Sequence, residues 1–173
     1  MGMFSNLFRK PEAAKDPDSP APITIVAPVD GVIKPVEEVP DETFAAKILG
    51  DGFGVTPSSG TVVAPVSGTV TTIADAKHAV GITTPGGVEV LVHIGVDTVQ
   101  LKGAPFDLLV AAGQTVTAGK PIERVDVEAV KAAGKPTDVI VVFTNPESIA
   151  SLDVDTVGHT VTAGQKLGTM TTK

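Results

Sequence analysis

Apolar residues in this chain form short runs that alternate with polar residues and are interrupted by glycine and proline. In the run from Val88 to Ile94, every second residue is aliphatic, and Glu89, Leu91 and His93 lie between them. A period of two is typical of a β-strand with one buried face. Valine- and isoleucine-rich runs of similar length recur along the chain. The pattern predicts an all-β protein, an antiparallel β-sandwich or barrel-like domain.

Helix signals are few and short. Residues 127–133 favour a helix that Gly134 and Pro136 would end. Residues 105–109 favour a second one, with Pro105 in its first turn and Gly113 after its end. We therefore expect only a few short helices beside the strands.

Two internal repeats indicate duplicated β-units. The sequence APVDG at residues 27–31 recurs as APVSG at residues 64–68. Residues 113–122 and 158–167 share a second pattern, in which glycine, valine, glycine and an aliphatic residue follow one another at intervals of three. Glycines at fixed places suit turns, and the aliphatic residues between them suit inward packing. Two similar units are expected to fold against each other.

The chain divides into a leader, residues 1–21, and one domain, residues 22–173. The leader has apolar residues at roughly helical spacing, followed by two basic residues and a polar segment rich in proline and alanine. It is read either as a disordered leader or as a short amphipathic helix that touches a membrane surface weakly. The residues concerned are Met1, Met3, Phe4, Leu7, Phe8, Arg9 and Lys10.

Composition narrows the functional classes. The chain has no cysteine, which excludes disulfides and thiolate metal sites. Its formal net charge of −7 opposes nonspecific binding to nucleic acid. No apolar run approaches the roughly 20 residues of a transmembrane helix, and the first residues lack the pattern of a secretory signal. We expect a cytoplasmic protein with no nucleic-acid partner.

Two of the three histidines flank a strong turn signal. His78 and His93 lie on either side of Thr84-Pro85-Gly86-Gly87. An even loop centred between Pro85 and Gly86 pairs residues whose numbers sum to 171, and 78 + 93 = 171. The imidazoles would then lie opposite each other on one face, with Cβ atoms roughly 4.5–5.5 Å apart. An odd loop would shift the register by one and separate them.

The aliphatic positions of the second strand should face the core, so His93 should point away from it, beside Leu91. A histidine pair without a cysteine or a serine triad suits three kinds of chemistry. One imidazole could take a phosphoryl group covalently while the other and backbone N–H groups support it. Zinc could bind both rings with a carboxylate such as Asp97 or Asp41. General acid–base catalysis is the third. The glycine-rich residues 50–54 lack the lysine of a nucleotide-binding P-loop.

The sequence around His93, VHIGVDTVQLKG at residues 92–103, resembles the active-site signature of the glucose-class enzyme IIA proteins of the sugar phosphotransferase system. The similarity extends over residues 24–170, through the motifs at Ala27-Pro28, Val39-Pro40-Asp41, Gly50-Asp51-Gly52 and Lys77-His78-Ala79. The resemblance implies an antiparallel β-sandwich that accepts a phosphoryl group from the phosphocarrier HPr and donates it to a cysteine of the IIB domain of a sugar permease.

In that family pattern, His93 is the phosphorylated residue and His78 supports the phosphoryl group. Ala76 departs from the pattern, because many members have a threonine there whose hydroxyl can bond to the second histidine. The partner-binding residues that the resemblance and the strand pattern indicate are Asp41, Phe44, Leu91, Gly95 and Asp97.

Two other functions stay open at this stage. One is a zinc-dependent hydrolase on a related β-fold. The other is a purely regulatory binding module, although in the family regulation of further targets accompanies phosphoryl transfer and depends on phosphorylation state. The resemblance requires no cofactor, but it is compatible with zinc held by His78, His93 and a carboxylate of a partner.

Overall fold

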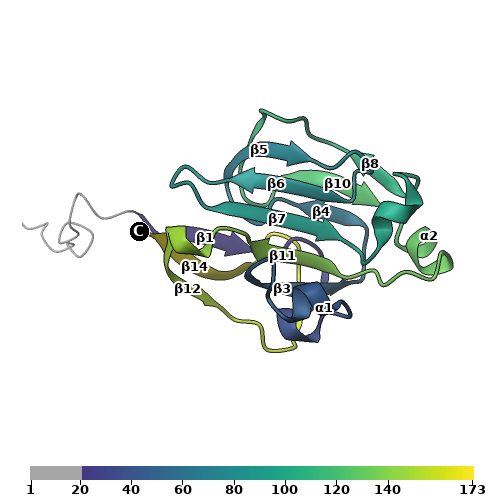
Figure 1. Ribbon diagram of the computed structural model, residues 1–173, viewed down its shortest axis with the longest axis horizontal. Coiled ribbons are helices and arrows are strands. Elements are labelled where there is room, and N and C mark those ends of the chain that lie inside the picture. Colours follow the sequence, from purple (N-terminus) through teal and green to yellow (C-terminus); the bar gives the residue numbers. More distant parts are fainter. Residues whose placement is uncertain (1–20) are drawn as a thin grey trace, which may run out of the picture.

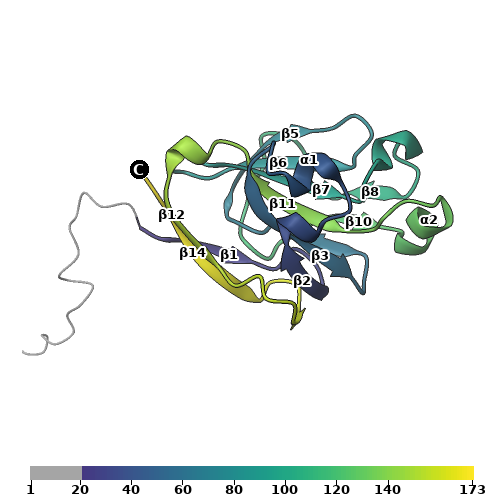
Figure 2. The ribbon, with the colours of Figure 1, turned by 60° about the horizontal axis from the view of Figure 1, so that its bottom comes forward.

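The computed structural model describes residues 21–173, which form three antiparallel sheets (Figure 1). The largest sheet has the strand order β13 (Thr160–Val161), β2 (Gly31–Pro35), β3 (Asp51–Pro57), β11 (Val139–Phe143), β7 (Glu89–Ile94), β6 (Ala79–Thr83), β5 (Gly68–Ile73), β9 (Thr115–Val116). The smaller sheets are β1 (Ile23–Val26), β14 (Lys166–Thr172), β12 (Ile149–Val154), and β4 (Thr61–Val63), β10 (Pro121–Val125), β8 (Phe106–Leu108). These layers pack around a shared core, which confirms the predicted all-β antiparallel sandwich (Figure 2).

The alternating run around β7 has the predicted orientation. Val88, Val90, Val92 and Ile94 are all at most 1% exposed and belong to the main core. The neighbouring strand β11 is buried along its whole length, because both of its faces are covered. Its second face contributes to a smaller apolar cluster on the far side of the sheet from the main core, made of Val36, Val39, Phe44, Val96, Ile140 and Val142. This second cluster supports the site described below.

The sequence repeats correspond to a structural duplication. In one unit, β13 pairs with β2 so that Val161 faces Gly31; in the other, β9 pairs with β5 so that Val116 faces Gly68. A turn glycine in each second motif then donates its N–H to the first alanine of the APV motif. These bonds join Gly164 to Ala27 at 2.9 Å and Gly119 to Ala64 at 2.8 Å. Equivalent residues thus make equivalent contacts, as expected for duplicated β-units.

Helices are short, and the one predicted at residues 105–109 is wrong. Helix α2 (Val127–Ala132) is present, and Asp126 caps it by accepting a hydrogen bond from the Ala129 N–H at 3.0 Å. The segment predicted as a helix at 105–109 instead contains strand β8, because Phe106–Leu108 pairs with β10. The remaining short helices are α1 (Glu42–Ala45), η2 (Val36–Glu38), η3 (Thr98–Leu101) and η4 (Pro146–Ser148).

One carboxyl group is buried in the small sheet of β4, β10 and β8. Glu123 is 0% exposed, and neither of its carboxyl oxygens has a hydrogen-bond partner among the described residues. Burial raises the pKa of Glu123 to about 8; attraction to Lys77 opposes this rise and repulsion by Asp107 adds to it. The Glu123 side chain is therefore a neutral acid at pH 7.

The predicted leader lies outside the described residues except for Ala21, so neither of its two interpretations is tested here. Within residues 21–173, no helix has both the length and the apolar character needed to cross a membrane.

Candidate functional site

His93 lies near the end of β7, on the sheet face opposite the main core. Its strand neighbours are Ala79 in β6 and Ile140 in β11. The side chain is partly buried, as is Leu91, which lies on the same face of β7 and packs against the second apolar cluster. As predicted, His93 points away from the core and lies beside Leu91.

The predicted hairpin register is wrong by one residue. In the structure Ala79, not His78, is paired with His93, and Thr83 is paired with Glu89. The connection is a turn in which the Gly87 N–H bonds to the Thr84 carbonyl at 2.9 Å, and Gly87 has φ +88°. Glycine readily adopts this left-handed conformation, which adds one residue to the loop and makes its length odd.

The two imidazoles nevertheless meet, for a different reason. His78 precedes β6 and follows Lys77, which has φ +64°, so its side chain is not bound by the alternation of the strand. The His78 carbonyl accepts a hydrogen bond from the Ile94 N–H at 2.7 Å, which holds this turn against β7. The ring centroids of His78 and His93 are 5.0 Å apart, with the rings at 80° in an edge-to-face arrangement.

A hydrogen bond to the backbone defines which nitrogen of His93 is free. Its Nδ1 lies 2.8 Å from the Gly95 carbonyl oxygen. A carbonyl oxygen can only accept, so Nδ1 carries the proton in this bond. In a neutral imidazole the other nitrogen, Nε2, then has the lone pair. The site therefore presents Nε2 of His93 as a nucleophile.

The Gly95 carbonyl is held in place by the chain around it. The Gly95 N–H donates to the Asp138 carbonyl at 2.7 Å, and the Thr98 hydroxyl donates to the Ile94 carbonyl at 2.5 Å. Gly95 has φ +79°, and a Cβ built on it would lie 2.3 Å from Cγ2 of Thr98 and 3.1 Å from the Pro136 carbonyl oxygen. Only glycine fits here without displacing the loop that orients His93.

We expect Gly95→Ala to disturb the hydrogen bond from Nδ1 of His93 to the residue 95 carbonyl, because the added methyl group must move Thr98 or the loop. The matched control is Gly87→Ala, since Gly87 also has positive φ but a Cβ there meets nothing within 4 Å. Both variants should lose about 1–2 kcal/mol of stability from backbone strain, measured by urea unfolding. Only Gly95→Ala should also change the ¹⁵N chemical shifts of the His93 ring; the same ring shifts in both variants would contradict the orienting role of the Gly95 carbonyl.

Phe44 forms the apolar side of the site. It is 5% exposed, and its ring centroid lies 5.0 Å from that of His93, with the rings tilted by 60°. Phe44 belongs to the four-residue helix α1 (Glu42–Ala45), and Asp41 directly precedes this helix. The Asp41 carboxylate caps this helix by accepting from the N–H groups of Thr43 at 2.8 Å and Phe44 at 3.1 Å. Asp41 thus holds in place the helix that carries Phe44.

Asp97 follows the site on the loop after β7. It is exposed and has φ +59°, and its side chain makes no capping bond to η3. The structure therefore brings His78, His93, Phe44, Leu91 and Gly95 together. Asp41 and Asp97 lie near enough to His93 for their charges to act on its pKa.

Two exposed apolar residues lie on the segments beside the site and were not predicted from the sequence as functional residues. Ile48, just after α1, is 72% exposed, and Val99, in η3, is 51% exposed. Each lies a few residues from a predicted site residue, Phe44 or Asp97. A large aliphatic residue at a position that the strand pattern does not bury is the signal that could have identified them.

The surroundings of the two histidines disfavour the protonated form of both imidazoles. Burial and, to a lesser extent, the neighbouring His78 lower the pKa of His93 to about 4, although the Gly95 carbonyl, Asp41 and Asp97 oppose the shift. Burial also lowers the pKa of His78. Because an unprotonated imidazole is the nucleophilic form, the environment of His93 keeps it reactive throughout the neutral pH range.

His78 is less well anchored than His93. Its Nδ1 is buried and has no hydrogen-bond partner among the described residues. Ala76, two residues earlier, is partly buried and has no polar side-chain atom to offer. The departure from the family pattern noted at residue 76 thus coincides with an unsatisfied ring nitrogen.

The histidine pair does not form a complete zinc site within the part of the chain that the structure describes. Among residues 21–173, no three histidine, cysteine, aspartate or glutamate side chains are grouped so that they could hold a metal ion. In addition, Nδ1 of His93 is already bonded to the Gly95 carbonyl. The chain offers a zinc ion two imidazoles, and a further ligand would have to come from another molecule.

Residues 23–149 match the family model of the phosphoenolpyruvate-dependent sugar phosphotransferase system, EIIA 1. A relative from Halalkalibacterium halodurans, named PTS system glucose-specific EIIA component, is 44% identical over 149 residues, which are 86% of each chain. A Staphylococcus aureus protein of the same name is 40% identical over 153 residues, covering 88% of this chain and 89% of that protein.

A longer relative and a solved structure show the same similarity. The PTS system glucose-specific EIICBA component of Streptococcus pneumoniae is 50% identical over 129 residues; the match covers 75% of this chain and only 18% of that protein. The structure of the glucose permease IIA from Mycoplasma capricolum superposes with a TM-score of 0.78 at 37% identity. That match covers 86% of this chain and 96% of the other.

Proposed function

Because the chain belongs to the EIIA 1 family of the phosphoenolpyruvate-dependent sugar phosphotransferase system, we propose that it carries a phosphoryl group on His93. The group would come from phosphorylated HPr and pass to a cysteine of the IIB domain of a sugar permease, in the cytoplasm. The longer Streptococcus relative supports a permease partner, since the name EIICBA joins IIC, IIB and IIA in one chain.

The observation that carries the proposal is the orientation of His93. Its Nδ1–H is bonded to the Gly95 carbonyl at 2.8 Å, and its pKa is lowered to about 4, so Nε2 has a free lone pair at neutral pH. The imidazole of His78 and the apolar ring of Phe44 each have their ring centroid 5.0 Å from that of His93. This arrangement suits covalent catalysis by nitrogen.

In the first step, Nε2 of His93 attacks the phosphorus of phosphohistidine on HPr. A nitrogen–phosphorus bond forms at His93 as the corresponding bond in HPr breaks, and its electron pair returns to the HPr imidazole. The ring of His93 becomes positively charged, and its Nδ1–H bond to the Gly95 carbonyl stabilises this charge. No proton has to move during the transfer.

In the second step, a cysteine thiolate of the IIB domain attacks the same phosphorus, and the bonding electrons return to Nε2 of His93. His78 would donate a hydrogen bond from its outward nitrogen, Nε2, to a phosphoryl oxygen, because its Nδ1 is buried. The charges of Asp41 and Asp97 nearby would keep the phosphorylated state from becoming too stable. A carrier needs this balance, since a tightly held group could not be passed on.

The surface around His93 suits transient docking of protein partners. Ile48 and Val99 offer exposed apolar contacts, and Asp97 offers an exposed carboxylate to a partner cation. HPr and the IIB domain would use this surface in turn, so each complex has to dissociate readily. If a partner protein supplied a carboxylate, the histidine pair could also hold a zinc ion, although the proposed phosphoryl transfer requires no metal.

For the second histidine, we expect His78→Gln to accept the phosphoryl group from phospho-HPr but to pass it to the IIB domain about 10²- to 10³-fold more slowly, the usual loss of one transition-state hydrogen bond. Ala76→Thr is the companion variant. It offers a hydroxyl to the unsatisfied Nδ1 of His78 and should leave donation as fast as in the native chain or faster. Rapid-quench single-turnover assays measure the rate of phosphoryl acceptance and the rate of donation separately. Equal slowing of both steps in His78→Gln would contradict this division of roles.

The proposal is tested by incubating the purified chain with phosphoenolpyruvate, enzyme I and HPr and measuring its mass. One phosphoryl group per chain is expected, lost on mild acid treatment and transferred when IIB is added. Omission of HPr should abolish the modification. An unmodified chain in the complete mixture would refute the function.

A further inference from the structure

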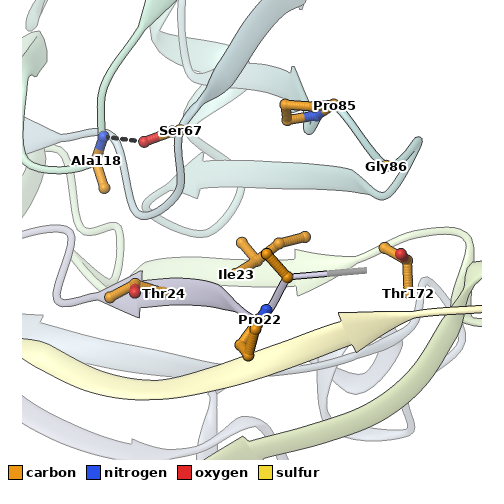
Figure 3. A pocket seen from close by; sticks show the side chains of 9 residues that line it. Pro22, Ile23, Thr24, Ser67, Pro85, Gly86, Ala118 and Thr172 are labelled. Carbon is orange, nitrogen blue, oxygen red and sulfur yellow. Dashed lines mark hydrogen bonds between the residues drawn. The ribbon is translucent and has the colours of Figure 1, made fainter. Parts of the chain in front are cut away.

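A groove lies away from the histidines, between two layers of the sandwich (Figure 3). One side is formed by the start of β1 and the end of β14, where Ile23 and Thr172 face into it. The other side is formed by Pro85 and Gly86, at the turn between β6 and β7. Its volume is about 400 Å³, which is within the range of sites that hold a few apolar side chains.

The groove is uncharged and has a fixed wall. None of its lining residues is acidic or basic. Ser67 and Ala118 complete the side that faces β1, and the Ala118 N–H donates to the Ser67 hydroxyl oxygen at 2.9 Å, which ties two loops together (Figure 3). Carbon surface from proline, isoleucine, alanine and threonine methyl groups dominates. An uncharged apolar segment is the occupant that this surface fits.

This groove is separate from the phosphoryl site. Pro85 and Gly86 are at one end of the β6–β7 hairpin, and the histidines are at the other. The five paired residues of β6 alone span roughly 17 Å. A ligand in the groove therefore does not contact His93.

The first described residues of the chain lie at the groove. Ala21 and Pro22 are among its lining residues, so the leader is attached at its edge. The first eight residues, MGMFSNLF, contain no charged side chain and include two phenylalanines, a leucine and two methionines. The segment thus matches the groove in polarity, whereas the positions that follow it, Arg9 and Lys10, do not.

We propose that the groove binds the apolar beginning of this same chain, with Phe4, Leu7 and Phe8 as the inserted side chains. Residues 9–20 form a tether of 12 residues, which reaches about 40 Å when extended and is long enough to fold back. A tether this short holds the segment at an effective concentration in the millimolar range, so even weak contacts fill the groove. An aromatic side chain buries about 150–250 Å² of surface, which is enough to cover much of the groove.

A single tryptophan tests the proposal, because the native chain has none. In Phe8→Trp, the indole should emit at shorter wavelength, and acrylamide should quench it several-fold less than in Ala14→Trp, where the probe is in the tether. Adding Ala118→Arg, at a partly buried groove position across from β1, should restore full quenching of Phe8→Trp. Adding Thr56→Arg, an exposed position on β3 outside the groove, should not.

Several results would overturn intramolecular docking. The tryptophan at residue 8 could be quenched as freely as that at residue 14, or its protection could be unaffected by Ala118→Arg. Protection that rises with protein concentration would indicate a second copy as the occupant. Protection that arises only with phosphatidylglycerol vesicles would assign the segment to membranes. Phosphorylation of His93 in Ala118→Arg is measured in parallel and should match the native rate, which keeps this test independent of the proposed function.

Discussion

Replacing His93 by glutamine should give a folded protein that no longer accepts the phosphoryl group from phospho-HPr. An amide nitrogen has no available lone pair, so the covalent step is lost, and the rate should fall on the order of 10⁶-fold, as when a catalytic nucleophile is removed. Glutamine keeps a polar side chain of moderate size at this partly buried position, so the fold should be retained. The measurement is transfer of label from radioactive phosphoenolpyruvate through enzyme I and HPr.

The matched control is His159→Gln. His159 is also a partly buried histidine, but it lies in the turn before β13, where its backbone carbonyl accepts a hydrogen bond from the Ile33 N–H. Its replacement should leave the labelling rate unchanged. Labelling of a histidine in the His93→Gln protein would show that the phosphoryl acceptor has been assigned wrongly.

Replacing Glu123 by leucine should stabilise the protein, most strongly at alkaline pH. The buried carboxyl has no hydrogen-bond partner in the described part of the chain, and its pKa of about 8 compares with 4.5 for an exposed glutamate. The unfolded chain releases this proton near pH 4.5 and the folded chain only near pH 8. Below pH 4.5 the carboxyl is protonated in both states and does not favour unfolding. As the pH rises from 4.5 to about 8, ionisation increasingly favours the unfolded chain, so the stability of the folded protein falls. At pH 7 the loss is on the order of 3 kcal/mol, which leucine would remove.

Urea unfolding at several pH values measures this effect. Glu123→Gln is the companion variant, since it keeps the shape but cannot ionise. The stability of Glu123→Gln should not fall between pH 5 and pH 8. Glu123→Leu should show the same flat pH dependence and also be more stable than the native chain at each pH. A native chain and a Glu123→Gln variant with the same pH dependence would show that Glu123 is ionised in the folded protein.

The strand pattern and the repeats were sufficient to predict the fold class, because both can be recognised directly in the sequence without knowledge of long-range contacts. The alternation from Val88 to Ile94 identified the buried face of β7, and the APV motifs identified the duplicated units. Residues 105–109 were mistaken for a helix, since the pairing of Phe106–Leu108 with β10 is a long-range contact that local signals do not reveal. The burial of Glu123 was missed for the same reason.

The sequence predicted that His78 and His93 meet, but not the geometry by which they do. The turn signal at Pro85-Gly86 was correct, but the positive φ of Gly87 adds one residue and changes the register. The histidines still meet because of the backbone conformation at Lys77, which no local pattern indicates. The hydrogen bond from His93 to Gly95, which selects the reactive nitrogen, likewise depends on a loop held by Asp138 and Thr98.

The most direct test of the account is to identify the phosphorylated atom. Long-range proton–nitrogen correlation spectra of the ¹⁵N-labelled, phosphorylated chain distinguish the two ring nitrogens of each histidine. The account predicts phosphorus on Nε2 of His93, with a proton on Nδ1 that is still bonded to the Gly95 carbonyl. Phosphorus on Nδ1 of His93, or on His78, would contradict it.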